Sequence, residues 1–217
     1  MPYRRTENVV RRLAEREQAI LDAAGAIAAE AGMGAVQIAA VAARAGIAAG
    51  TVYRYFPSKT DLVAELVAAV AGRELDAMKA AADAAPGPLS ALAACIATFA
   101  ARALNARRLA WAVMGEPVDA KVDAMRLDFR QSLAAELAKR IQTAIAGGHL
   151  PDQDARLAAP AIVGALMEGL IGPLAPSHDD DAAGSREAVQ TATLLVLRAL
   201  GMVDARAREL VAQCVLP

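Results

Sequence analysis

The sequence predicts an all-α fold, with a small N-terminal head of three helices joined by a long helix to a helical body. Hydrophobic residues make up 56% of the 217 residues, and alanine dominates them. Apolar residues recur at helical spacing, and no stretch shows the apolar–polar alternation of a strand. Gly- and Pro-containing breaks divide the chain into segments of helical length. We therefore expect helices that approach closely through small side chains.

The first helix is expected at about 11–31, where a buried stripe of apolar residues repeats at helical spacing. Gly32 and Gly34 should end this helix, because glycine favours helix termini. The stripe consists of Leu13, Ile20, Ala24, Ile27 and Ala31.

Two short helices follow, separated by a glycine. Val41, Ala42 and Ala45 lie at the spacing of one helical face. Gly46 stands where a helix C-terminus favours a left-handed residue. The next helix, at about 49–55, is too short to be stable alone and must pack against its neighbours. This arrangement is a helix-turn-helix, which presents its second helix to the major groove of DNA.

The second short helix is rich in hydroxyl and cationic donors, which phosphate oxygens accept. They are Thr51, Tyr53, Arg54, Tyr55 and Lys59. The tyrosines are either DNA contacts or core aromatics, and we favour DNA contacts because a small head cannot easily bury their hydroxyls. For Phe56 we favour the core.

Residues 41–62, VAARAGIAAGTVYRYFPSKTDL, resemble the DNA-binding signature of the tetracycline-repressor (TetR) family of bacterial transcriptional regulators. The resemblance implies an all-helical homodimer that binds palindromic operator DNA and is released by a small molecule. Ala48 stands where the family usually has a capping serine, and Gln37 where it usually has threonine. Ala49 is also a weak reader of bases. The DNA-contacting set implied is Arg4, Arg5, Gln37, Ala48, Ala49, Gly50, Thr51, Tyr53, Arg54, Tyr55 and Lys59.

The charge distribution agrees with a phosphate-binding head. The whole chain has a net charge of −1, yet residues 1–60 are net positive and the remainder is net negative. Residues before Arg11 would form a flexible arm. Arg4 and Arg5 would then either reach a minor groove or remain disordered.

A long helix, from about residue 59 to residue 82, should connect head and body. Ser58 is a good N-cap, and Asp61 three residues later resembles a capping box with aspartate in place of glutamate. Backbone N–H groups at this helix start, beside Lys59, offer a seat for a phosphate. We expect a DNA-binding domain at 1–60 and an effector-binding and dimerisation domain at 61–217.

The body should contain helices at about 89–105, 107–114, 119–146, 153–172, 185–200 and 204–214. The segments 157–174 and 188–200 are apolar nearly all round, so they should be buried on more than one side. The family resemblance implies that the last two long helices pair with their copies in a second subunit; the alternative is burial inside a monomer. Small or apolar interface residues would be Ala161, Gly164, Ala165, Ala192, Leu195 and Ala199.

The middle helices should enclose an effector pocket, because they hold most of the scarce aromatic and methionine side chains. For any single residue we favour an ordinary core position over a contact with the effector. With few aromatics and many aliphatics, the pocket would suit a hydrophobic or amphipathic effector. The candidate residues are Cys95, Phe99, Arg102, Trp111, Met114, Met125, Phe129, Met167 and Glu168.

Catalysis finds no support in the sequence, so no enzyme activity, cofactor or metal is expected. The two histidines, His149 and His178, lie in loops without a nucleophile or metal-ligand spacing. The segment His178–Asp181 is interpreted as a solvated acidic loop. No uninterrupted apolar run reaches the length of a membrane span, and two cysteines are too few for a disulfide framework. A reducing cytoplasm is therefore expected.

These observations favour a one-component transcriptional regulator, with repression as the family-level expectation. The alternative is a helical-bundle protein that binds a partner and whose head, with Ala48 and Ala49, binds DNA only weakly and without sequence preference.

Overall fold

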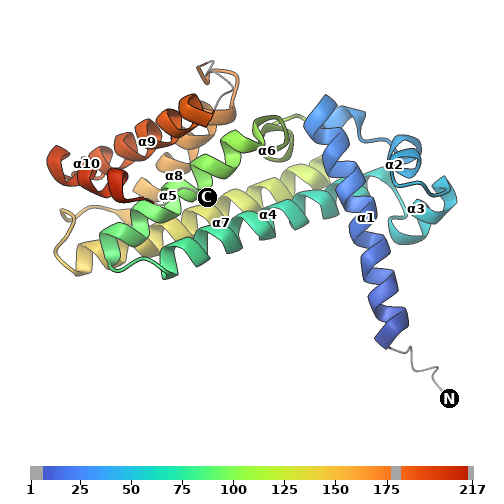
Figure 1. The fold of residues 1–217 in the computed structure, drawn as a ribbon, viewed down its shortest axis with the longest axis horizontal. Helices are drawn as coiled ribbons and strands as arrows, with labels where there is room; N and C mark the ends of the chain where they lie inside the picture. Colours follow the sequence, from blue (N-terminus) through green and yellow to red (C-terminus); the bar gives the residue numbers. More distant parts are fainter. Residues whose placement is uncertain (1–6, 177–181, 215–217) are drawn as a thin grey trace.

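The computed structural model describes residues 7–176 and 182–214. Within these ranges the chain is all-α, with no strand, as the sequence predicts. The predictions made for Arg4, Arg5 and the segment 178–181 lie outside the described residues. The molecule is elongated, with the head at one end and the last helices at the other (Figure 1).

The head comprises α1 (Glu7–Ala31), the 3₁₀ turn η1 (Met33–Ala35), α2 (Ile38–Arg44) and α3 (Ala49–Tyr55). Ile20, Ala24 and Ile27 of α1 are buried as predicted, whereas Ala31 is exposed and Leu13 is only half-buried. The prediction that residues before Arg11 form a flexible arm is wrong for residues 7–10. These residues belong to α1, whose first turns project away from the body in Figure 1. Helix formation can extend there because the segment contains neither glycine nor proline.

The turn between α2 and α3 has the predicted glycine geometry. Gly46 has a φ of +66°, and its N–H donates to the carbonyl of Ala43 at 3.2 Å. Ile47 N–H donates to Ala42 at 3.0 Å, so both groups satisfy carbonyls at the end of α2. A side chain at position 46 would meet no atom within 4 Å. The requirement for glycine is therefore conformational and not steric.

The body is built along α4 (Lys59–Asp83), which starts four residues after α3 ends and runs from the head along the body beside α7 (Ala120–Ala146) (Figure 1). Helices α5 (Pro88–Asn105) and α9 (Ala182–Ala199) pack together, and α10 (Asp204–Gln213) packs against both. Helix α6 (Arg107–Met114) contacts α1 and so joins the body to the head. One continuous apolar core runs from the head into the body through α4.

The predicted helix at 153–172 differs in detail. It consists of α8 (Ala155–Leu166) followed by a π-helical turn, η2 (Met167–Ile171). The helical pattern in the sequence is continuous here, and the π-helical turn re-aims the backbone without breaking it. The segments 157–174 and 188–200 are not covered on every side, because Leu157, Leu174 and Leu195 are exposed in the single chain.

Candidate DNA-binding head and effector-binding body

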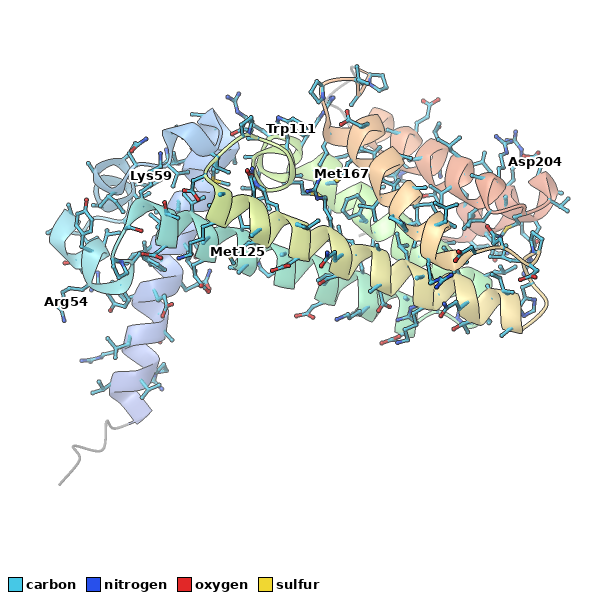
Figure 2. All side chains as sticks on the ribbon, turned by 180° about the vertical axis from the view of Figure 1, so that it is seen from behind. Arg54, Lys59, Trp111, Met125, Met167 and Asp204 are labelled. Atoms are coloured by element: carbon cyan, nitrogen blue, oxygen red, sulfur yellow. The ribbon has the colours of Figure 1, made fainter. Side chains whose placement is uncertain are left out.

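Helix α3 presents one face outward and packs the other against the head. Val52 is fully buried and Phe56, at its C-terminal end, is 4% exposed, as predicted for Phe56. Ala49, Gly50, Tyr53 and Arg54 are exposed and form an i, i+4 stripe on the outward face. Arg54 projects from the end of the head, far from the body (Figure 2). Two of its four residues, Tyr53 and Arg54, carry the hydrogen-bond donors that a contact with DNA would use.

The two tyrosines of α3 have different environments. Tyr53 is 51% exposed, with its hydroxyl free to meet a phosphate. Tyr55 is half-buried and packs against the apolar core. Thr51 of α3 and Lys59, the first residue of α4, are also half-buried. Within this predicted set, Tyr53 and Arg54 are therefore the most accessible donors.

The helix starts in the head lack side-chain caps where the sequence departs from the family pattern. Ala48 occupies the N-cap of α3 with extended backbone angles and gives no side-chain hydrogen bond. Gln37 occupies the N-cap of α2, but its side-chain Nε2 donates to the Gly34 carbonyl at 2.9 Å instead of capping the helix. Packing of Val52 and Val41 holds these short helices in place without those caps.

The start of α4 is capped and tied to α7. Asp61 N–H donates to Ser58 Oγ at 3.1 Å, and Ser58 Oγ donates to the Asp61 carboxylate at 2.7 Å. In a standard capping box the acidic side chain would accept from the N-cap backbone N–H. The hydrogen bond from Lys121, followed by that from Ser58, lowers the pKa of Asp61. Beside it, Thr60 donates to Asp119 at 2.7 Å, which lowers the pKa of that carboxyl.

A second junction joins the loop after α6 to the head. The Met33 N–H donates to Glu116 Oε2 at 2.6 Å, across 83 residues of sequence. Gly32, with a φ of +82°, leaves room for this carboxylate, because a Cβ there would lie 2.6 Å from Glu116 Oε1. Motif reasoning missed this contact, since neither end has a local sequence signal.

Arg126 holds the loop that carries Glu116. Its side chain is 3% exposed and donates to the carbonyls of Ala112, Val113 and Glu116, three backbone acceptors at the end of α6 and just beyond. Burial lowers the pKa of this guanidinium, although the nearby Asp123 carboxylate acts in the opposite direction. An arginine so placed fixes the end of α6 relative to α7.

The nine predicted pocket residues do not line one cavity. Four of them line a small cavity of about 40 Å³, namely Phe99, Arg102, Met114 and Phe129. Cys95 and Met167 are buried in the core, Trp111 and Met125 are half-buried, and Glu168 is exposed. The Trp111 ring covers Gly115, where a Cβ would collide with it.

A larger groove of about 500 Å³ lies between α4, α5 and α10. Five alanines of α4, α5 and the segment between them line it together with Leu210 of α10, and Arg102 is the only predicted pocket residue among its lining residues. Its volume falls in the range of about 300–1,000 Å³ typical of small-molecule sites. The sequence does not predict this groove, because alanines carry no ligand-binding signal.

The predicted dimer residues gather on one face of α8 and α9. Ala161, Gly164, Ala165 and Ala199 are exposed, Leu195 is 62% exposed, and Ala192 is half-buried. Leu157, at 71% exposure, extends the same helix surface beyond the predicted set. A hollow of about 420 Å³ between α8, η2 and α9 includes Ala165, Ala192 and Leu195.

Helix α5 is the one candidate for a membrane span among residues 7–176 and 182–214. It has 18 residues and a mean hydropathy of 1.3. Its apolar run is interrupted by Ser90, Thr98 and Arg102, in agreement with the prediction that no uninterrupted run reaches the length of a span. In addition, 61% of it is buried inside the body, between α4, α7 and α9, which is typical of a core helix. Over the same ranges, no three His, Cys, Asp or Glu side chains form a group that could hold a metal ion.

Comparison with known proteins supports the assignment of the head. Residues 20–66 match the family model described as bacterial regulatory proteins, tetR family. The HTH-type transcriptional repressor KstR of Mycolicibacterium smegmatis is 54% identical over 71 residues, which are 33% of this chain and 33% of KstR. The chain thus spans about a third of the length of the curated relatives it matches.

Solved structures match the whole fold. FadR of Bacillus halodurans has a TM-score of 0.74 at 22% identity, with 87% of this chain and 97% of FadR covered. FadR of Bacillus subtilis in complex with stearoyl-CoA has a TM-score of 0.71 at 22% identity, with 82% and 96% covered. At such identities the likeness is one of fold.

A three-helix head with an exposed second helix, carried on a long helix at one end of a helical body, defines a helix-turn-helix protein of the regulator class. Its head matches both the family model and the KstR repressors. The head, within residues 20–66, is thus similar to that of the bacterial regulatory proteins of the tetR family.

Proposed function

We propose that the protein is a homodimeric, one-component transcriptional repressor in the cytoplasm, and not an enzyme. Its head, residues 1–60, would bind palindromic operator DNA, and its body, residues 61–217, would dimerise and bind a small hydrophobic or amphipathic effector. The observation that carries the proposal is the outward stripe of α3, which exposes Tyr53 and Arg54 within the segment that matches the family model.

Dimerisation is supported by the apolar face of α8 and α9. Leu157 and Leu195 are large apolar side chains exposed on helices whose neighbouring positions are alanine and glycine. Small residues allow helices of two subunits to approach closely, and a two-fold protein matches a palindromic site. Two heads held in this way would reach consecutive major grooves.

Effector control is supported by the continuous path from α4 into the head. The FadR that shares this fold was solved with stearoyl-CoA, an amphipathic molecule, and alanine is the most frequent residue in the lining of the groove of about 500 Å³. The effector must bind the DNA-incompetent arrangement more tightly, because equal affinity for both arrangements shifts nothing. A tight ligand that is a small hydrophilic dianion would contradict a hydrophobic effector.

The dimer is tested by Leu195→Arg, which places a charge on the exposed face without disturbing the core. Sedimentation should show a dimer for the wild-type protein and a folded monomer for the variant, with weaker operator binding. Glu187→Arg would be an unsuitable control because Glu187 borders the same hollow. The matched control is Glu65→Arg, at an exposed position of α4, and this variant should remain dimeric. A dimeric Leu195→Arg would contradict the assigned interface.

A further inference from the structure

The groove between α4, α5 and α10 contains an unusual polar stripe. Ser90, Thr98 and Arg102 lie at i, i+8 and i+12 on α5, so they share the helix face that lines the groove. The opposing wall consists of alanines of α4, including Ala77 and Ala81. Gln213 and Cys214, at the C-terminal end of α10, are the other polar residues that line this largely apolar groove.

Thr98 is the first observation that points to a ligand. Its side chain lines the groove while the residue is only 5% exposed. Within residues 7–176 and 182–214 its hydroxyl has no hydrogen-bond partner, whereas the other buried threonine, Thr193, donates to the Val189 carbonyl at 2.8 Å. Buried hydroxyls are normally paired, so the Thr98 hydroxyl is available to a molecule in the groove.

Arg102 lies one helical turn after Thr98, and its guanidinium is oriented so that it can bind an anion. Its Nε and Nη2 donate to the two carboxylate oxygens of Glu74, at 2.6 and 2.8 Å. This pairing orients the guanidinium and raises its pKa. In the described part of the chain Nη1 makes no hydrogen bond, so the Nη1/Nη2 edge remains open. A guanidinium can bind a second carboxylate along such an edge.

We propose that this groove binds an amphipathic monocarboxylic acid, whose carboxylate accepts hydrogen bonds from Arg102 and Thr98 and whose apolar chain lies along the alanines of α4. The inference rests on the proposed function, because the acid would be the effector. Glu74 acts as a positioning residue for Arg102.

The position of the groove supplies a route to the head. The wall formed by Ala77 and Ala81 belongs to α4, whose first turn carries Thr60 and Asp61 and their contacts to α7. A chain lodged between α4 and α10 would favour a different placement of α4. The acid then acts on DNA affinity only to the extent that it binds the two placements unequally.

The test uses dodecanoate as the probe and the full-length protein without DNA, with affinity measured by isothermal titration calorimetry. Methyl dodecanoate, which keeps the chain and loses the charge, is the matched ligand. Wild-type protein should bind dodecanoate at least about tenfold more tightly than the ester, as expected for charge-assisted hydrogen bonds.

Two variants examine the two donors separately. Arg102→Gln should abolish the preference for acid over ester, and Thr98→Val should weaken dodecanoate binding severalfold while its melting temperature stays equal or rises. A variant with weaker dodecanoate binding and an equal or higher melting temperature has not simply lost its fold, because a damaged fold would lower the melting temperature. Arg108→Gln, which removes an exposed arginine of α6, should bind like the wild type.

Equal binding of acid and ester, absence of dodecanoate binding, or unchanged affinity in both variants would overturn the assignment. Operator affinity without any acid is measured on the same samples. If the wild-type protein binds operator DNA but the acid experiment fails, the proposed function as a regulator is retained and the groove is rejected as the effector site. If the wild-type protein does not bind operator DNA, the proposed function as a regulator is rejected.

Discussion

The hydrogen bond from the Met33 N–H to Glu116 predicts a measurable loss of stability in Glu116→Ala. Met33 is fully buried, so removing the carboxylate leaves a buried donor without its partner. Such a group costs about 1–3 kcal/mol. For a chain of this size that corresponds to roughly 2–4 °C of melting temperature for each kcal/mol.

The assay is thermal unfolding followed by circular dichroism, with amide hydrogen exchange at Met33 as the local readout. Glu65→Ala is the control, since Glu65 is an exposed glutamate of α4 without a hydrogen bond or ion pair in the described part of the chain. Glu116→Ala should melt below the control, and its Met33 amide should exchange faster. Equal melting temperatures with equal protection at Met33 would refute the assigned junction.

Four further changes have defined outcomes. Ala48→Ser adds the missing cap of α3 and should raise the free energy of unfolding by about 0.5–2 kcal/mol in urea titrations; an unchanged midpoint would contradict this. Lys59→Ala should leave folding intact and reduce the slope of log affinity for operator against log salt by about 1, whereas an unchanged slope would exclude a phosphate contact. Tyr53→Phe should weaken operator binding in fluorescence anisotropy without changing the melting temperature. Burial raises the pKa of the Cys95 thiol from 9.0 to about 12. In the folded protein at pH 8, Cys95 should therefore be alkylated about a thousandfold more slowly than an ordinary thiol, and this difference should disappear when the protein is unfolded. Mass spectrometry should find Cys214 labelled first.

Much of the head could be predicted from the sequence, because its determinants are local. Gly46 specifies the turn, and the spacing of Val41 and Val52 specifies which faces are buried. Ser58 caps α4 as expected. In each case a residue and its structural effect lie within a few positions of each other.

The junction and the groove could not be predicted because they depend on distant segments. Glu116 and Met33 are 83 residues apart, and Arg102 and Glu74 are 28 residues apart. The scarce aromatic and methionine side chains predict a pocket among the middle helices, although the core is favoured for each single residue. In the structure Phe99 and Met167 are buried in the core. The groove formed instead beside alanines, which leave space because they are small, and residue type alone does not indicate where such space remains.

The most direct test of the regulator is a genomic DNA-binding selection with the purified protein. It is followed by affinity measurements for the best site and for scrambled DNA at one near-physiological salt concentration. We expect a palindromic site that is preferred over scrambled DNA by about 10³ or more, and we expect Arg54→Ala to abolish this preference. Weak binding that is indifferent to sequence would contradict this expectation and would favour a helical-bundle protein that binds a partner.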